Sequence, residues 1–104
     1  MRGEIWLVNA DPTVGSEITK TRPCVVVSPA EMHDYLRTVI VAPMTTGSRE
    51  PPFRIGVTHG GRKGLILLDQ MRAADKARLA KKLGAVSAKT LTSTLSTLQE
   101  VFTE

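Results

Sequence analysis

Residues 21–29 read TRPCVVVSP, and this stretch indicates the type of fold. Proline is tolerated at the start of a β-strand, and the run Cys24 to Val27 that follows contains three valines, which favour strands. Residues 28–31, SPAE, then have the pattern of a helix capping box with proline in the first turn. The stretch therefore predicts a strand followed directly by a short helix that ends near Leu36.

Four further runs have the composition or the alternation of β-strands and are bounded by turn residues. Residues 3–9 and 53–58 alternate in hydrophobicity, and residues 38–43 are rich in β-branched side chains. Residues 65–68 are entirely apolar, which predicts burial on both faces. The predicted loops between the strands are residues 13–21 and 45–52.

The last third of the chain has helical spacing. Leu79, Leu83 and Val86 predict one helix, with Gly84 as its C-cap. A second helix is predicted after Ser87, with a leucine stripe that serves as core or as a dimer contact. Five strands followed by helices predict a mainly β (α+β) domain built on a small, strongly bent antiparallel sheet or barrel with a C-terminal helix. The stripe consists of Leu91, Leu95, Leu98 and Phe102.

The length and charge of the chain limit its class. With 104 residues, the chain is expected to form a single domain over residues 1–104. A net charge of +4 and a pI near 9.6 favour polyanionic partners, of which nucleic acid is the first candidate. Residues 72–89 hold six Lys and Arg against Asp75 alone, and this run either solvates a helix face or binds the polyanion.

Several chemistries lack their motifs. A single cysteine, Cys24, permits no internal disulfide and is expected to be an inert core thiol. The two histidines, His33 and His59, match no zinc spacing and are expected to lie at the surface. Nucleotide-binding glycine motifs are missing too, so neither a metal nor a cofactor is predicted. Without a signal sequence or an apolar run long enough to span a membrane, a cytoplasmic protein with no membrane partner is expected.

Arg22 is the most informative single residue. Pro23 disfavours helix for the residue before it and holds Arg22 extended. A guanidinium at a strand entrance presents a rigid fork that matches phosphate oxygens. Two interpretations remain open at this point: a phosphate contact, or a residue without a binding role, either a plain surface arginine or a structural ion pair with Glu17.

Hydroxyl and charged side chains follow two other strands. Thr45 and Thr46 come after the run that ends in Pro43-Met44, where they either donate to a phosphate or form an ordinary turn. Asp69 emerges from the buried run 65–68 and is either a base or a partner for Arg72. For stacking on bases, Phe53 is the best aromatic candidate, although a core role is equally open.

The order and spacing of four motifs resemble those of the MazF/PemK (Kid) toxins of bacterial toxin-antitoxin modules. The motifs are GEIWLVNADPTVGSE at 3–17, TRPCVVVSP at 21–29, VAPMTTG at 41–47 and GLILLDQMR at 64–72. The resemblance covers nearly the whole chain. It implies a small SH3-like barrel, a homodimer, and inhibition by a cognate antitoxin whose C-terminal segment covers the RNA groove.

The resemblance also implies an activity. Family members are sequence-specific, ribosome-independent, metal-independent endoribonucleases that cleave single-stranded mRNA to leave a 2′,3′-cyclic phosphate (or 3′-phosphate) and a 5′-hydroxyl. Their catalytic arginine and threonine map to Arg22 and Thr45, and acidic residues near the site map to Glu17 and Asp69. The expected RNA-binding residues are Ser16, Thr19, Thr46, Ser48, Arg49, Arg54 and Gln70.

The chain departs from the PemK branch at two positions. Ser16 stands where that branch has a histidine, and Leu67 stands where it has an arginine. The acid-base pair of that branch is therefore not carried over, and the expected arrangement is the MazF-like arginine and threonine. Two alternatives remain: a non-catalytic CcdB-like gyrase poison, whose C-terminal Trp-Gly-Ile this chain lacks, and an inactive nucleic-acid-binding relative.

Overall fold

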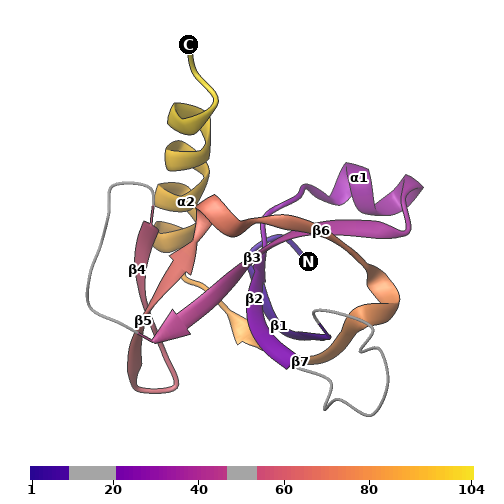
Figure 1. The fold of residues 1–104 in the computed structure, drawn as a ribbon, viewed down its shortest axis with the longest axis horizontal. Coiled ribbons are helices and arrows are strands. Elements are labelled where there is room, and N and C mark those ends of the chain that lie inside the picture. Colours follow the sequence, from indigo (N-terminus) through magenta and orange to yellow (C-terminus); the bar gives the residue numbers. More distant parts are fainter. Residues whose placement is uncertain (10–20, 47–53) are drawn as a thin grey trace.

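A long strand, β3 (Thr38–Thr46), runs through the middle of the fold (Figure 1). The structure is a computed structural model that describes residues 1–9, 21–46 and 54–104. Around β3 stand β1 (Glu4–Asn9), β2 (Thr21–Val26), α1 (Ala30–Tyr35), β4 (Arg54–His59), β5 (Arg62–Leu67), the 3-10 turn η1 (Leu68–Gln70), β6 (Arg72–Asp75), the 3-10 turn η2 (Lys76–Arg78), β7 (Leu79–Ala85) and α2 (Ala88–Val101).

Strand β3 is shared by three partners. One edge pairs with β2, in a register that sets Val25 opposite Ala42. The other edge pairs first with β6, over residues 38–41, and then with β5, over residues 44–46. The strand order is β4-β5-β3-β2-β1-β7, with β6 joined to β3, and all these pairs are antiparallel. The five predicted strands and the predicted antiparallel, mainly β architecture are confirmed.

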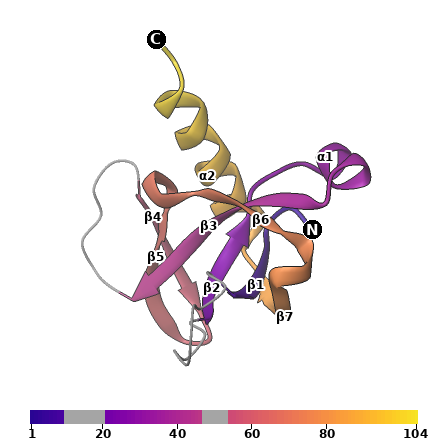
Figure 2. The ribbon, with the colours of Figure 1, turned by 45° about the vertical axis from the view of Figure 1, so that its right-hand side comes forward.

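Both faces of the sheet are packed, because apolar residues occupy successive positions in β2 and β3. Ala42 and Met44 belong to a first core cluster, which also receives Ile66 of β5 and Leu98 of α2. Figure 2 shows α2 standing against the part of the sheet that holds the β4-β5 hairpin. The second cluster lies on the opposite face, beneath β6 and the start of β7. It consists of Val8, Cys24, Val26, Val39, Val41 and Ala74.

The sheet curls until its outermost strands meet. A Cβ built on Gly84 of β7 would lie 3.1 Å from Cε1 of His59, at the end of β4. The described residues show no hydrogen-bonded ladder between β4 and β7, so the curl is barrel-like without being closed. Gly84 has φ +155° and no side chain, and both properties allow the imidazole to lie on its backbone.

The helix predicted from Leu79, Leu83 and Val86 is wrong. Strand β7 covers this segment, and its pairing with β1 carries two register shifts that leave Ala80 and Leu83 as extra residues. As a result, Leu79 packs on the second core cluster and Leu83 on the first. An i, i+4 leucine spacing here reflects a bulged strand that covers the edge of β1. Gly84 is consequently not a helix C-cap.

Helix α1 forms where it was predicted, but not by the predicted cap. Pro29 is the N-cap and makes no side-chain cap bond. The Ser28 hydroxyl instead accepts from the backbone N–H of Ile40 at 2.9 Å and bonds Nε2 of His33 at 2.6 Å. The prediction of a surface His33 is wrong, because this contact buries the ring beneath the helix. Burial, and secondarily the charge of Lys76, lowers the pKa of His33.

Helix α2 confirms the predicted C-terminal helix. The Ser87 hydroxyl accepts from the backbone N–H of Thr90, as an N-cap does. Leu98 packs on the first core cluster, whereas Phe102 at the end of the stripe is largely exposed. Over the described part of the chain, no helix combines the length and hydropathy needed to cross a membrane.

The buried His33 predicts how stability depends on pH. A pKa below the ordinary 6.5 means that the unfolded chain takes up a proton more readily than the folded protein. The contribution of neutral His33 to the free energy of unfolding is fully present above about pH 7. It is lost as the pH falls through 6.5 toward the lower pKa of the folded protein. In urea unfolding, the free energy of unfolding is expected to fall as the pH is lowered from 7.5 to 5.5. His33→Gln, which keeps a partner for Ser28, is expected to remove most of this pH dependence. An equal slope in both proteins would contradict the assignment.

Candidate functional site

Arg22 and Thr45 meet at the end of the β2-β3 ladder. The last pair of this ladder is Cys24 with Pro43. Carried two residues further, the same antiparallel register sets Arg22 opposite Thr45, so that both side chains belong to one face. Both residues are exposed, and both line a pocket of about 430 Å³. The structure therefore brings together two of the three predicted catalytic residues in its described part, and the third, Asp69, does not line this pocket.

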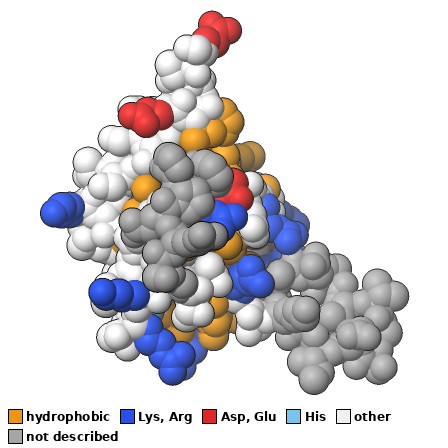
Figure 3. Space-filling model, turned by 60° about the vertical axis from the view of Figure 1, so that its left-hand side comes forward, with side chains coloured by type: hydrophobic (Ala, Val, Ile, Leu, Met, Phe, Trp, Pro, Cys, Tyr) orange, Lys and Arg blue, Asp and Glu red, His pale blue; other side chains and the backbone are white. Residues whose placement is uncertain are grey.

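The pocket lies where strand ends converge with the tip of the β4-β5 hairpin. Its inner part is apolar, with Pro23, Met44 and Leu83. Hydroxyl and charged residues complete the wall. These are Thr21, Arg22, Thr45, Thr46, His59, Arg62 and Lys63, together with Gly64. Figure 3 shows Lys and Arg side chains over the lower part of one face, with hydrophobic side chains exposed among them.

Local contacts hold Arg22 in place. Its neighbour Pro23 pairs with Leu7 of β1, and Arg22 itself pairs with Val8. The carbonyl of Arg22 accepts a weak bond from the Cys24 thiol at 3.5 Å. Burial raises the pKa of Cys24 to about 11, so the thiol stays protonated at neutral pH and is a poor nucleophile.

Thr45 and Thr46 belong to β3, so their prediction as turn residues is wrong. Thr45 pairs with Leu65 and Thr46 pairs with Gly64. The Thr45 hydroxyl makes only a long contact, 3.5 Å, to the neighbouring carbonyl of Thr46. A Cβ added to Gly64 would lie 2.5 Å from the Thr45 carbonyl oxygen, so only glycine permits this close approach of β5 to β3.

Asp69 lies outside the pocket, in a contact of its own. Arg54 donates to both of its carboxylate oxygens, Nε to Oδ1 and Nη2 to Oδ2, each at 3.0 Å. This pairing lowers the pKa of Asp69. Neither Asp69, Arg54 nor Gln70 is among the described residues that line the pocket. Arg54, which was predicted to contact RNA, is thus a partner of Asp69.

Five predicted site residues lie outside the described residues. They are Ser16, Glu17, Thr19, Ser48 and Arg49. The stacking candidate Phe53 lies outside them as well, as does the proposed ion pair of Arg22 with Glu17.

Sequence reasoning missed the contribution of the hairpin tip to the pocket. His59 pairs with Arg62 across Gly60 and Gly61, whose φ values of +60° and +77° are those of a tight hairpin turn. His59 is half-buried, and Arg62 and Lys63 are exposed beside it. The signal was present in residues 59–64, HGGRKG, a glycine turn flanked by cationic residues.

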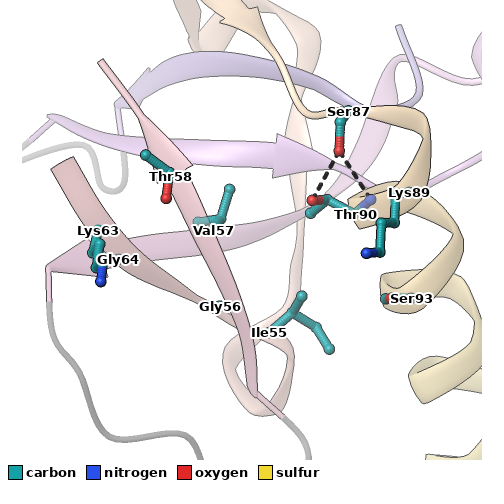
Figure 4. A pocket seen from close by; sticks show the side chains of 10 residues that line it. All are labelled: Ile55, Gly56, Val57, Thr58, Lys63, Gly64, Ser87, Lys89, Thr90 and Ser93. Atoms are coloured by element: carbon teal, nitrogen blue, oxygen red, sulfur yellow. Dashed lines mark hydrogen bonds between the residues drawn. The ribbon is translucent and has the colours of Figure 1, made fainter. Parts of the chain in front are cut away.

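A second pocket, of about 730 Å³, lies between the hairpin and α2 (Figure 4). The Ser87 hydroxyl donates to the Thr90 hydroxyl at 3.0 Å and accepts from the Thr90 N–H, so these groups serve the helix cap. None of the predicted site residues within the described ranges lines this cavity. Lys63 and Gly64 line both pockets, so β5 separates the two.

The described residues contain no group of three His, Cys, Asp or Glu side chains that would hold a metal ion. The observed pocket combines exposed cations, hydroxyl groups and an apolar floor at the end of a curled antiparallel sheet. A small β-rich protein with such a site is suited to bind a phosphate ester that carries an apolar group.

Comparison with known proteins identifies the family. Residues 1–102 match the family model described as PemK-like, MazF-like toxin of type II toxin-antitoxin system. Endoribonuclease PemK of Escherichia coli is 37% identical over 108 residues, covering 98% of this chain and 81% of PemK. Endoribonuclease MazF of Staphylococcus epidermidis is 35% identical over 92 residues, covering 83% and 77% of the two chains. This chain therefore belongs to the PemK-like, MazF-like toxin family.

The fold agrees with that assignment. A chain in the crystal structure of MazE-MazF from Deinococcus radiodurans superposes with a TM-score of 0.79 and 28% identity, covering 95% of this chain and 91% of that one. The match supports the expectation of a barrel-like fold with a C-terminal helix.

The approach of Gly64 to Thr45 predicts a sensitive position. Gly64→Ala is expected to lower the free energy of unfolding by about 1–3 kcal/mol, because the new methyl group forces β5 away from β3. Lys63→Ala, one residue earlier on the same strand and exposed, is expected to stay within about 0.5 kcal/mol of the wild type. Urea unfolding of the three proteins measures the difference. Equal stability of Gly64→Ala and wild type would show that the strands are not in such close contact.

Proposed function

We propose that this protein is a metal-independent endoribonuclease toxin that cleaves single-stranded RNA, with Arg22 and Thr45 as its catalytic residues. The observation that carries the proposal is that these two exposed residues, each two positions beyond the last pair of the β2-β3 ladder, line one pocket. Family membership supports the same activity, since the PemK and MazF relatives are named endoribonucleases.

The reaction uses a nucleophile that the substrate itself carries. The RNA 2′-hydroxyl attacks the adjacent phosphorus, so that the O2′–P bond forms while the P–O5′ bond breaks. The products are a 2′,3′-cyclic phosphate, which water opens to a 3′-phosphate, and a 5′-hydroxyl. DNA lacks the 2′-hydroxyl and is not cleaved. The substrate supplies the nucleophile and the cationic pocket supplies the charge, so the proposed reaction requires no metal ion.

Arg22 and Thr45 act where negative charge develops. The nonbridging oxygens gain charge as the pentacovalent phosphorus forms, and a fixed guanidinium and a donating hydroxyl stabilise them. Strand pairing fixes the backbone positions of both residues before the substrate arrives, which limits the reorganisation that is needed. We further propose that Arg62 and Lys63 hold flanking phosphates and that Thr46 contacts the RNA.

The two acidic residues predicted near the site, Asp69 and Glu17, have different roles in this proposal. Asp69 is engaged by Arg54, and a paired, ionised carboxylate outside the pocket is better suited to position Arg54 near the RNA than to move a proton. Glu17 remains the candidate acid or base from the sequence. Gln70, together with Ser16, Thr19, Ser48 and Arg49, remains a predicted RNA contact.

Two protein partners are proposed. Solved relatives include MazE-MazF complexes and an endoribonuclease in complex with its cognate antitoxin. We infer that this chain has a cognate antitoxin too, and that an acidic antitoxin segment covers the cations of the pocket. The protein is also inferred to be a cytoplasmic homodimer.

The proposed activity is tested with two substitutions. Arg22→Ala and Thr45→Ala are each expected to stay folded and to slow cleavage of a long RNA transcript about 10²- to 10³-fold, because each removes a transition-state donor. Arg37→Ala and Thr92→Ala are the matched controls; both residues are exposed and lie outside the pocket. Cleavage is followed on gels with EDTA present and with DNA of the same sequence.

Wild-type rates in folded Arg22→Ala and Thr45→Ala proteins would refute both roles. If the wild type binds RNA without cleaving it, the protein is better described as an inactive nucleic-acid-binding relative. If it inhibits gyrase and does not cleave RNA, it is better described as a CcdB-like gyrase poison.

The homodimer is tested by sedimentation. At micromolar concentration the purified protein is expected to sediment with twice the 11.3 kDa mass of the chain. A mass of 11.3 kDa throughout the concentration series would contradict the dimer.

A further inference from the structure

We propose that the pocket beside Arg22 and Thr45 is a nucleobase-recognition site in which a base next to the scissile phosphate stacks on the imidazole of His59. This inference rests on the proposed endoribonuclease function and assigns the part of the site that selects the RNA sequence. His59 thereby becomes a specificity-determining residue of the reaction.

The shape and lining of the pocket match a base better than a phosphate. Met44 and Leu83 supply an apolar floor, and the volume of about 430 Å³ falls in the range of small-molecule sites. A nucleobase has apolar faces and a polar edge, and an extruded base in RNA recognition is held by stacking and by hydrogen bonds to that edge. The hydroxyls of Thr21 and Thr46 are available for such bonds.

His59 is held in position for stacking. Ile55 and Val57 precede it at alternate positions of β4 and pack on the first core cluster, so His59 belongs to the same inward face. Its Cε1 edge lies against the bare backbone of Gly84. Within the described part of the chain, neither ring nitrogen has a protein hydrogen-bond partner. The ring therefore packs by its edge against β7, which leaves a ring face for stacking.

The strand geometry separates the base from the phosphate. Met44 and Thr46 flank Thr45 in β3, and alternation puts them on the face opposite Thr45. Met44 shares the first core cluster with Leu83, so this face is the one that borders the pocket floor. A nucleotide that crosses the end of β3 thus sets its phosphate toward Arg22 and Thr45 and its base toward His59. Arg62 and Lys63 at the rim meet the next phosphates.

Base binding is tested without cleavage by NMR. The imidazole signals of His59 are followed while adenosine, guanosine, cytidine and uridine 3′-monophosphates, and inorganic phosphate, are added separately. The expected result is a shift with one or two of the nucleotides that phosphate alone does not produce. Shifts identical for all four nucleotides and for phosphate would overturn the proposal. Thr45→Ala is expected to lose RNA cleavage and to keep the base-dependent shift.

Substitution at His59 tests the role in cleavage. His59→Ala is expected to weaken the binding of uncleavable 2′-O-methyl RNA about 5- to 150-fold, the loss typical of one stacked base. In cleavage, KM should rise more than kcat falls, and sequencing of the cleaved ends should show a relaxed preference at one position beside the cut. His59→Phe keeps a stacking face and is expected to recover most of the affinity while losing part of the base preference.

The only other histidine, His33, supplies the matched control. His33→Gln changes a buried histidine of α1, outside the pocket, and should leave both affinity and sequence preference unchanged. If the wild type cleaves RNA and His59→Ala cleaves the same sites with the same KM, the base site is refuted while the endoribonuclease stands. If the wild type fails to cleave but the nucleotide-dependent shift is present, the proposed function fails and the base site stands.

Discussion

Hydrogen bonding of β3 to three other strands is the constraint on which the architecture depends. Its pairing with β2 on one edge, and with β6 and then β5 on the other, makes the sheet bend at the point where the partner changes. The bend separates the interior into two clusters, one on each face. It also carries β5 and its hairpin round until β4 reaches β7.

The site follows from the same arrangement. Arg22 and Thr45 are far apart in sequence and come together only because β2 and β3 run antiparallel in one register. Pro23 contributes twice: it keeps Arg22 extended, and it lies in the pocket wall. Gly64 then allows β5 to approach Thr45 closely, so one missing side chain fixes how the hairpin tip sits beside the site.

Much of this was predictable from local sequence, and the failures have physical causes. Valine-rich runs and glycine turns gave the strands, and Ser87 gave the start of α2, because those signals are local. The segment that became β7 was misassigned because bulges break the two-residue period by which a strand is recognised. His33 was expected at the surface because the local sequence does not indicate that its ring forms a hydrogen bond with Ser28. The glycine turn and its cations are visible in residues 59–64, but only the fold brings His59 of that turn against distant Gly84 of β7 and into the pocket.

The seam between His59 and Gly84 has one more consequence. Side chain meets backbone there without a ladder, so the outer hairpin has no register to keep with the strand it touches. Its tip can gain or lose pairs of residues while the rest of the sheet stays as it is. In such a scaffold the length of one short segment beside the pocket can change without altering the β2-β3 pairing that positions Arg22 and Thr45.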